Sequence, residues 1–519
     1  MYGDVTTGGP PETSSPDPLA SQAVSPTNRR VTPAGSPTAK RATKRERVGT
    51  DMLRLFRHHV PMWSLVELLA DGLLCFVAIL VASTRLPAGP IDPDLAFPEI
   101  LRTAAAFTLL MALLYGSVGL YRQGAICIGI RALSGRGLAA LGLGAFIAYV
   151  LIHRRDGVDA FVLLANAVPL MAIGIIAVRG AGHAVRIAAV GARRVLIVGT
   201  GPDAVAVARD LAADRGKRHT VVGFYPTYAA DPEAARAQGL SAPVFGAGIA
   251  IDEVVRKHHV DEVIVAVREQ RGGGVPMDQL LACRIRGIPV LHLAGFFERA
   301  KGEVPIDSLK ASWLVYGHGF VQGVVRTAVK RAFDIAMSLI LLAIFAPVMV
   351  VTALAIRLES RGPIIYRQER VGLRGRPFMC LKFRSMCVDA EKDGVARWAA
   401  KNDVRITRVG AFIRKCRIDE LPQLFSVLRG EMSLVGPRPE RPSFVEQLQA
   451  EIPFYDIRHS VKPGVTGWAQ VRYTYGASIE DARKKHQFDL YYVKNHSLFL
   501  DVLILVETVS VVVFREGAQ

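Results

Sequence analysis

The sequence predicts a membrane α-helical bundle of four spans, then a Rossmann-like α/β domain, then an α-rich domain with a re-entrant membrane helix. Three observations predict this fold class. The 519-residue chain has a mean hydropathy of +0.27, which is too high for an ordinary soluble protein. Four apolar stretches lie between residues 62 and 178, each close to the roughly 20 residues that cross the hydrocarbon. From residue 191, short apolar runs alternate with amphipathic stretches, which is typical of a parallel α/β sheet.

The chain is strongly basic, with 64 Lys and Arg residues against 46 Asp and Glu residues and a net charge of +18. A basic balance fits nucleic acid, anionic lipid or phosphorylated substrates equally well. The apolar stretches favour a membrane surface, so we expect no nucleic-acid partner. None of the six cysteines forms a Cys-x-x-Cys pair, which argues against a zinc ribbon or a disulfide framework and for reduced thiols in or facing the cytosol.

The N-terminal part divides into a tail and a bundle. Residues 1–60 are basic, rich in Pro, Ser and Thr early on, and contain no signal peptide in their first 50 residues, so they predict a disordered tail. Residues 61–190 predict the four-helix transmembrane domain, with spans near 62–84, 103–121, 137–152 and 160–178. Lys and Arg residues precede the first span, follow the fourth and occupy the middle loop, which places both ends in the cytoplasm. Arg154 and Arg155 disagree, because they fall on the predicted outer side.

Two acidic residues, Glu67 and Asp71, lie four positions apart in the first span and therefore share a helix face. Acidic residues within a span usually face the interior of a bundle. The alternative is that Glu67 lies near the membrane interface and is solvated.

The Rossmann-like domain is predicted over residues 191–300, with buried strands at Val195–Val198, Val221–Phe224, Val263–Val267 and Ile288–Leu291. Gly199 and Gly201 form a G-x-G-x-x-A turn after the first strand, where a helix N-terminus could receive a phosphate. A dinucleotide site also needs an acidic residue at the end of the second strand, and none is present there. The turn therefore fits either a structural or regulatory role or a bound nucleotide.

A linker is predicted over residues 301–325, and a fifth apolar run follows at Phe333–Ile356. Basic residues flank this run on both sides, so both flanks are expected in the cytoplasm. Pro347 lies within the run, where it removes a backbone donor and kinks a helix. A kinked helix that enters and leaves by one membrane face satisfies these observations; the alternative is an ordinary span or a buried core helix.

The adjacent carboxylates Asp419 and Glu420 lie among basic residues, with Arg417 before them and Arg438 after them. Paired carboxylates can bind Mg²⁺ together with a diphosphate, and a carboxylate can also attack phosphorus. Guanidinium groups hold phosphate oxygens in pairs of hydrogen bonds. These residues indicate a site that handles phosphate; the alternative is a solvated network of ion pairs.

Six ordered motifs extend this pattern over the C-terminal region. They are Lys330-Arg331-Ala332-Phe333-Asp334, the stretch 362–372 around Tyr366-Arg367-Gln368-Glu369-Arg370, Leu381-Lys382-Phe383-Arg384-Ser385-Met386, the stretch 417–424 around Asp419-Glu420, the stretch 432–440 around Gly436-Pro437-Arg438-Pro439-Glu440, and the stretch 462–470 around Gly464-Val465-Thr466-Gly467-Trp468. On these motifs, residues 326–519 resemble the catalytic domain of the bacterial sugar transferases, the monotopic phosphoglycosyl transferases. The upstream half resembles the large members that begin exopolysaccharide synthesis.

The resemblance implies a role for each matching residue. Asp419 is expected as the nucleophile and Glu420 as its partner, both close to Mg²⁺. The residues expected to bind the nucleotide or the substrate phosphates are Arg438, Lys382, Arg384, Arg417 and Glu440. Lys330 and Arg331 are expected near the lipid phosphate at the membrane interface, and Pro347 at the break of the re-entrant helix. Many members carry Ser before that proline, whereas this chain carries Ala346.

The resemblance further implies transfer of a sugar-1-phosphate from a UDP-sugar to undecaprenyl phosphate. We expect UDP-glucose or UDP-galactose as the donor, although the sequence itself does not choose among glucose, galactose and N-acetylated or deoxy sugars. UMP is released through an aspartyl-phosphosugar intermediate, and the reaction begins assembly of an exopolysaccharide repeat unit. The enzyme is expected in the bacterial cytoplasmic (inner) membrane, in contact with its lipids and with the catalytic domain facing the cytoplasm. Further copies of the chain and other polysaccharide-assembly proteins are candidate partners.

Two other functions remain open at this point. The first is a membrane-bound, NAD-dependent nucleotide-sugar dehydratase or epimerase, which needs a Tyr-x-x-x-Lys pair. No tyrosine in this chain has Lys four residues later. The second is a non-catalytic scaffold for polysaccharide assembly, which release of UMP by the purified protein distinguishes from an enzyme.

Overall fold

The computed structural model of the chain describes residues 52–514 apart from 56–57, 86–92, 122–129, 153–158, 190–192, 214–218, 228–241, 247, 268–274, 307–308, 310–322, 389, 391–402, 404, 474–475 and 477. Most of the predicted N-terminal tail lies outside these residues. Its last part, predicted as disordered, instead forms an antiparallel hairpin of β1 (Met52–Leu55) and β2 (His58–Pro61).

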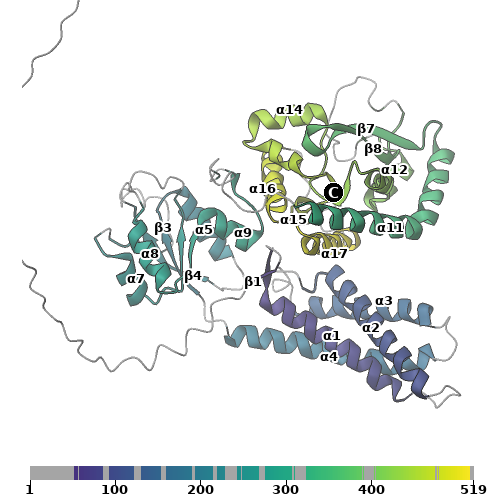
Figure 1. Ribbon diagram of the computed structural model, residues 1–519, viewed down its shortest axis with the longest axis horizontal. Helices are drawn as coiled ribbons and strands as arrows, with labels where there is room; N and C mark the ends of the chain where they lie inside the picture. The colour runs from purple at the N-terminus through teal and green to yellow at the C-terminus, as the bar shows by residue number, and fades with distance from the viewer. Residues whose placement is uncertain are drawn as a thin grey trace, which may run out of the picture. The chain divides into compact units, whose positions relative to one another are not determined.

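Four long helices follow and lie side by side (Figure 1): α1 (Met62–Ser83), α2 (Pro93–Ser117), α3 (Ile130–Ile152) and α4 (Ala160–Ala189). Each contains a stretch long and apolar enough to cross a membrane. Large side chains such as Met111 and Met171 are fully buried between the helices. Others, such as Leu69 and Ile173, are exposed, as expected for helices that face lipid.

Glu67 and Asp71 both face the interior of this bundle. Arg179 on α4 donates hydrogen bonds to both carboxylates, with 2.6 Å between its Nη1 atom and Glu67 Oε2. Tyr121 donates a further bond to Asp71 over 2.9 Å. Glu67 is only 6% exposed, so the alternative of a solvated side chain is wrong.

A parallel sheet with the order β4-β3-β5-β6 follows the helices. Its strands are β3 (Arg193–Val198), β4 (His219–Tyr225), β5 (Glu262–Val265) and β6 (Val290–His292), one at each of the four predicted positions. Helices α7 (Ile251–Lys257) and α8 (Met277–Ile285) cover one face, and α5 (Pro202–Ala213) and α9 (Leu293–Lys301) cover the other (Figure 1). Alternate side chains along β3 enter the two apolar layers, as the two-residue period of a strand requires.

The predicted glycine turn lies between β3 and α5. Gly199 has a φ of +117°, and a Cβ atom there would lie 2.8 Å from the carbonyl oxygen of Ala266. The neighbouring backbone therefore requires glycine at this position whether or not a ligand binds. At Gly201, in contrast, no atom of the described residues lies within 4 Å of where a Cβ atom would be.

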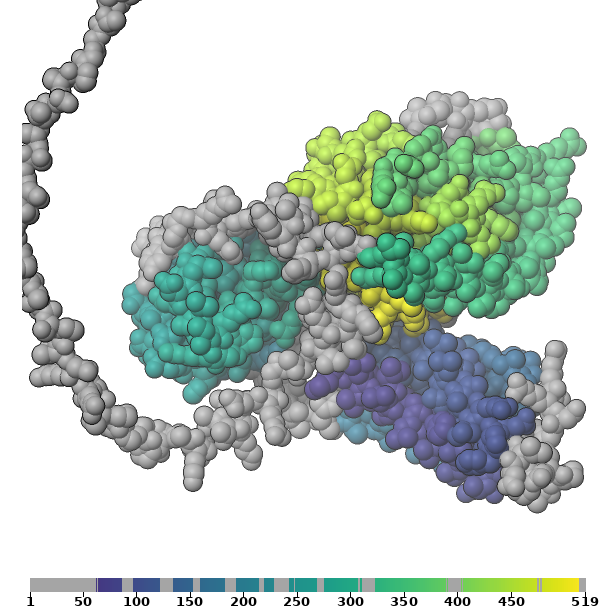
Figure 2. Space-filling view, viewed as in Figure 1, coloured from purple at the N-terminus to yellow at the C-terminus, as the bar shows by residue number. Residues whose placement is uncertain are grey.

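The C-terminal region is built around one large apolar core. Its first elements are α11 (Val324–Glu359), β7 (Ile365–Val371), β8 (Pro377–Phe383), α12 (Arg408–Lys415), the 3₁₀ turn η4 (Ile418–Glu420), α13 (Gln423–Arg429) and β9 (Ser433–Val435). Its last are α14 (Pro442–Glu451), η5 (Tyr455–Ser460), β10 (Gly464–Thr466), α15 (Trp468–Arg472), α16 (Ile479–Asn495) and α17 (Leu498–Phe514). Green and yellow atoms of this region adjoin in Figure 2. Lys330 on α11 and Asp501 on α17 form an ion pair of 2.7 Å. Val304 and Ile306, from the segment predicted as a linker, are buried in the same core.

Helix α11 carries the fifth apolar run and contains Pro347. Figure 1 shows that the helix changes direction partway along its length. Near its start, Arg331 donates hydrogen bonds to the carbonyls of Val427 and Leu428 on α13. At its end, Glu359 accepts a bond from the backbone N–H of Val409 at the start of α12. Both ends of the apolar helix are therefore attached to the same folded region.

Candidate active site

The two carboxylates Asp419 and Glu420 lie side by side in the tight turn η4, between α12 and α13. Arg417 begins this turn in the left-handed conformation, with a φ of +58°. The turn packs against β8, which pairs with β7 in an antiparallel hairpin, and Asp419 is only 8% exposed and Glu420 only 7%. Buried carboxylates are rare unless they are paired or functional, which makes this turn the leading candidate for chemistry.

Glu420 is held by two cations that come from distant parts of the sequence. Arg438, which follows β9, donates to Glu420 Oε1 over 2.7 Å, and Lys382 on β8 donates to the same oxygen over 3.0 Å. Burial alone would raise the pKa of Glu420, but Arg438 and Lys382 lower it well below its usual range. Glu420 is therefore a permanent anion that orients the guanidinium of Arg438.

Asp419, the residue next to Glu420, differs from it in its hydrogen bonds and in the direction of its pKa shift. Its Oδ1 atom is buried and accepts no hydrogen bond from any described residue. Burial, and then the neighbouring Glu420 carboxylate, raise the pKa of Asp419 above its usual range. A carboxylate oxygen without hydrogen bonds keeps its lone pairs free for a metal ion or an electrophile.

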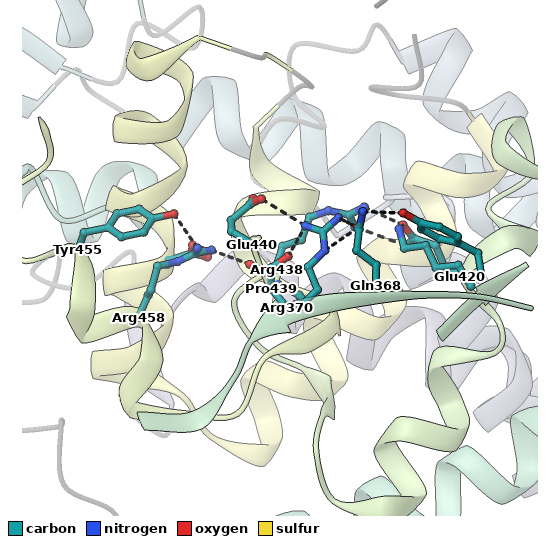
Figure 3. A network of polar contacts seen from close by, with 11 residues as sticks. Gln368, Arg370, Glu420, Arg438, Pro439, Glu440, Tyr455 and Arg458 are labelled. Atoms are coloured by element: carbon teal, nitrogen blue, oxygen red, sulfur yellow. Dashed lines mark hydrogen bonds and ion pairs between the residues drawn. The ribbon is translucent and has the colours of Figure 1, made fainter. Parts of the chain in front are cut away.

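Buried polar residues behind Arg438 fix its backbone (Figure 3). Arg458 donates from Nη2 to the Arg438 carbonyl over 2.8 Å and to the Asp489 carboxylate over 2.9 Å, and from Nη1 to the Tyr455 hydroxyl over 2.7 Å. The side chain of Arg458 is only 5% exposed, and its ion pair with Asp489 is almost fully desolvated. These contacts hold the chain that carries Arg438 in one conformation.

A second arginine, Arg370 on β7, lies on the other side of the same loop (Figure 3). It donates to the carbonyl of Pro439 over 2.9 Å and forms a longer contact of 3.5 Å with Glu440. Burial, partly opposed by Glu440, lowers the pKa of Arg370. Glu440, predicted to bind substrate phosphate, thus lies beside Arg370 rather than against the carboxylate pair.

The loop that carries Arg438 meets the segment after η5 through backbone atoms. A Cβ atom on Gly436 would lie 2.3 Å from the carbonyl oxygen of Lys462, and one on Gly464 would lie 2.1 Å from the backbone nitrogen of Gly436. Only glycine permits backbones to approach so closely. The two glycine-containing motifs are therefore parts of one structural unit.

Several of the predicted site residues lie elsewhere. Arg384 donates to the carbonyls of Ser360 and Arg361, in the turn after α11. Lys330 forms an ion pair of 2.7 Å with Asp501 on α17. Arg331 is bound to carbonyls of α13, Pro347 lies within α11, and the Gly199–Gly201 turn belongs to the parallel sheet. Of the predicted residues, the structure brings together Asp419, Glu420, Lys382 and Arg438, with Arg417 exposed beside them.

Sequence reasoning missed Arg458, Asp489, Tyr455 and the role of Arg370. Arg370 lies within one of the quoted motifs, so its position gave a usable signal. The pair of Arg458 and Asp489 gave none, because the two residues are 31 positions apart and lie on separate elements.

The carboxylate pair also offers ligands to a metal ion. Among the residues that the structure describes, no three His, Cys, Asp or Glu side chains are arranged to hold a metal ion. Mg²⁺ does not require three such side chains, because it keeps several waters and is commonly bound by one or two carboxylates together with substrate phosphates. Oδ1 of Asp419, which no described residue hydrogen-bonds, lies next to the Glu420 carboxylate and fits such a partial shell.

Known proteins are similar to this chain in sequence. A profile of the family "Bacterial sugar transferase" matches residues 325–515. The UDP-N-acetylgalactosamine-undecaprenyl-phosphate N-acetylgalactosaminephosphotransferase of Aeromonas hydrophila is 44% identical over 259 residues, which is 50% of this chain and 60% of that protein. The match therefore spans less than two thirds of the relative's length.

Two further relatives match larger shares of their own length. The UDP-glucose:undecaprenyl-phosphate glucose-1-phosphate transferase of Xanthomonas campestris is 33% identical over 341 residues, or 64% of this chain and 68% of that protein. A putative undecaprenyl-phosphate N-acetylgalactosaminyl 1-phosphate transferase of Bacillus subtilis is 59% identical over 131 residues, or 25% of this chain and 73% of that protein.

Proposed function

Because the chain belongs to the bacterial sugar transferase family, we propose that it transfers a sugar-1-phosphate from a UDP-sugar to undecaprenyl phosphate and releases UMP. The observation that carries this proposal is the contrast within the carboxylate pair. Oδ1 of Asp419 is buried and accepts no hydrogen bond from the part of the chain that the structure describes, while Glu420 is held between Arg438 and Lys382. One acid is thus available for reaction and the other is held as a fixed anion.

The first proposed step is attack by an Asp419 carboxylate oxygen on the sugar-bearing phosphorus. A bond forms between this oxygen and phosphorus, and the bond from phosphorus to the UMP oxygen breaks, so UMP leaves with its electron pair. Arg438 and Lys382 stabilise the negative charge on the phosphate oxygens. The product on the protein is an aspartyl-phosphosugar.

In the second step, an oxygen of undecaprenyl phosphate attacks the same phosphorus. The bond to Asp419 breaks, its carboxylate is restored, and the sugar leaves as an undecaprenyl diphosphate sugar. We propose that this product begins an exopolysaccharide repeat unit. Asp419 and Glu420 would hold Mg²⁺, which when bound neutralises charge on the diphosphate.

The membrane arrangement belongs to the same proposal. The helices α1 to α4 would be four spans with both ends in the cytoplasm, and the parallel-sheet region would be a Rossmann-like cytoplasmic domain. Helix α11 would be re-entrant, since both of its ends bind the same folded region. The site would then lie on the cytoplasmic face of the inner membrane, and UDP-sugars are found in the cytoplasm.

A second mechanism uses the same residues: Asp419 only binds Mg²⁺, and the lipid phosphate attacks the UDP-sugar directly. Incubation with UDP-sugar and Mg²⁺ without lipid separates the two. The covalent route must release UMP, up to one per active site, and leave the phosphosugar on the peptide that contains Asp419. If a preparation that is active with lipid releases no UMP without it, the covalent route is wrong.

Asp419→Asn keeps the shape of the side chain but removes the anionic nucleophile, so we expect UMP release to fall by roughly four orders of magnitude or more. Glu420→Gln should also be severely impaired, because Arg438 loses its anionic partner. The matched control is Asp456→Asn, at a carboxylate of the same region whose side chain is 76% exposed; it should keep its activity.

The donor sugar is tested by screening. The relatives named above act on N-acetylgalactosamine or glucose. UDP-glucose, UDP-galactose and UDP-N-acetylgalactosamine should therefore be compared for UMP release with undecaprenyl phosphate present. We keep UDP-glucose and UDP-galactose as the predicted donors, and release of UMP from only the N-acetylated donor would overturn that choice.

A further inference from the structure

The β7–β8 hairpin has two different faces, and one of them belongs to the candidate active site. Paired residues lie on the same face of a hairpin, and the register pairs Tyr366 with Lys382. Lys382 donates to Glu420, so Tyr366 shares a face with a lysine of the site. Ile365 and Phe383, which are paired on the other face, pack in an apolar cluster with the C-terminal part of α11. The face with Tyr366 is therefore turned away from the apolar helix.

Tyr366 has an aromatic ring that is exposed beside this lysine. The residue is 38% exposed, although it lies within a paired strand next to the site. Ligand sites are commonly lined by aromatic side chains together with a few polar groups, and an aromatic ring binds a planar group of a ligand through its face. The steps of the proposed reaction give this ring no role.

Gln368 fixes the position of the ring. Its Oε1 atom accepts hydrogen bonds from the Nε and Nη2 atoms of Arg370. A guanidinium has only donors, so the amide oxygen faces Arg370 and the Nε2 atom of Gln368 donates to the Tyr366 hydroxyl over 3.1 Å. Arg370 is itself bound to the carbonyl of Pro439, the residue after Arg438 (Figure 3). A ring that is held before the ligand arrives loses little freedom on binding.

The order of the residues points to the nucleotide part of the donor. In the proposed reaction Asp419 attacks the sugar-bearing phosphorus, and UMP leaves from the far side because the attacking and leaving oxygens are in line. Moving away from Asp419, the contacts run from Glu420 to Lys382 and then across the hairpin to Tyr366. A UMP phosphate at Lys382 therefore places its nucleoside close to the Tyr366 ring.

We propose that the ring of Tyr366 stacks on the pyrimidine base of the donor nucleotide. This inference rests on the proposed function, because it takes a UDP-sugar as the donor. Every nucleobase has a π-face, and stacking on an aromatic side chain contributes affinity without base-specific hydrogen bonds. The ring thus strengthens binding of the UDP part and leaves the choice of sugar to other residues.

The first test compares Tyr366→Leu with Tyr366→Phe in the full-length protein in nanodiscs. Leucine has no ring, so the KM for the UDP-sugar and the Kd for UMP, measured by calorimetry, should both rise about 5- to 100-fold. The kcat should change little, because the contact is the same in the ground state and the transition state. Tyr366→Phe keeps the ring and should change both values far less. The matched control is Met379→Ala, exposed on the other face of the same hairpin, which should change neither value.

The second test identifies the contact directly and needs no turnover. The base of 5-iodo-UMP cross-links to a stacked aromatic side chain on irradiation with long-wavelength ultraviolet light. In the natural protein the nucleotide should be found on the peptide that contains Tyr366, and Tyr366→Leu should abolish this product. A cross-link only to other peptides, or none in a preparation that binds 5-iodo-UMP, would overturn the proposal.

The outcomes separate this inference from the proposed function. UMP release with a KM that does not respond to Tyr366→Leu refutes the stacking and leaves the transferase proposal standing. If none of the donors releases UMP, the transferase proposal fails, and cross-linking of 5-iodo-UMP still decides the stacking. A raised KM for undecaprenyl phosphate with unchanged affinity for UMP would assign the ring to the lipid and refute the inference.

Discussion

The segment before α11 should be needed for the stability of the C-terminal region. Val304 and Ile306 lie outside the stretch that carries the sequence motifs, yet they are only 0% and 2% exposed within its core. The buried indole N–H of Trp468 donates to the carbonyl of Gly302 over 2.7 Å. Deleting residues 1–320 removes all three of these contacts, whereas deleting residues 1–300 keeps them.

The size of the effect follows from burial. Each fully buried Val or Ile contributes about 1.5–3 kcal/mol, and an indole N–H left without an acceptor costs about 1–3 kcal/mol. The shorter chain should therefore lose about 4–9 kcal/mol of folding stability. Since whole domains have only about 5–15 kcal/mol, this loss should leave the chain lacking residues 1–320 largely unfolded.

The assay is thermal unfolding of both truncated chains in the same detergent, followed by UMP release. We expect the chain that begins at Lys301 to unfold cooperatively and to retain activity, and the one that begins at residue 321 to show neither. In the full-length chain, Val304→Ala should lower the unfolding temperature, while Val324→Ala, at a side chain that is 87% exposed, should not. Equal stability of the two truncated chains would refute the reasoning.

Three further perturbations test the site and the helix. Arg458→Lys loses one of the hydrogen bonds that fix the Arg438 backbone, so the rate of UMP release should fall about tenfold. The unfolding temperature should fall less in Arg458→Lys than in Arg458→Ala. Arg417→Asn removes a positive charge that lowers the pKa of Asp419. That pKa then rises further, and because only the ionised carboxylate attacks, the acid limb of the pH–rate profile for UMP release should move to higher pH; an unchanged limb contradicts the assignment of Asp419. Pro347→Leu restores a backbone donor within α11 and should straighten the helix, lowering turnover while UDP-sugar binding, measured by calorimetry, is retained.

Local patterns in the sequence predicted the positions of the strands and apolar helices well, but they predicted few of the contacts between these elements. The four strands of the parallel sheet lie where short apolar runs predicted them, because a buried strand needs such a run. The pairing of Lys382 with Glu420 was hidden, since 38 positions separate the two residues. Lys330 was expected near a lipid phosphate on its motif alone, yet its charge is paired with Asp501, 171 positions away.

The burial of the segment around Val304 could likewise not be predicted from local sequence patterns. A few apolar residues in a stretch without periodicity predict a linker, because neither a helix nor a strand gives that pattern. Their burial depends on apolar side chains that other parts of the chain bring together in the core. The carboxylate pair could be predicted because basic residues and recognisable motifs surround it in the sequence. The buried ion pair of Arg458 and Asp489 could not, because no pattern in the neighbouring sequence indicates it.

The contact between Gly436 and Gly464 limits how such a site can diversify. Where two backbones touch, no side chain can be introduced, so the distance between the loop that carries Arg438 and the segment before α15 is set by peptide groups alone. A substitution at Gly436 or Gly464 cannot widen or narrow the site without disrupting the contact between the two backbones. Side chains around this backbone contact can still vary, so substitutions intended to change the proposed donor should be made there.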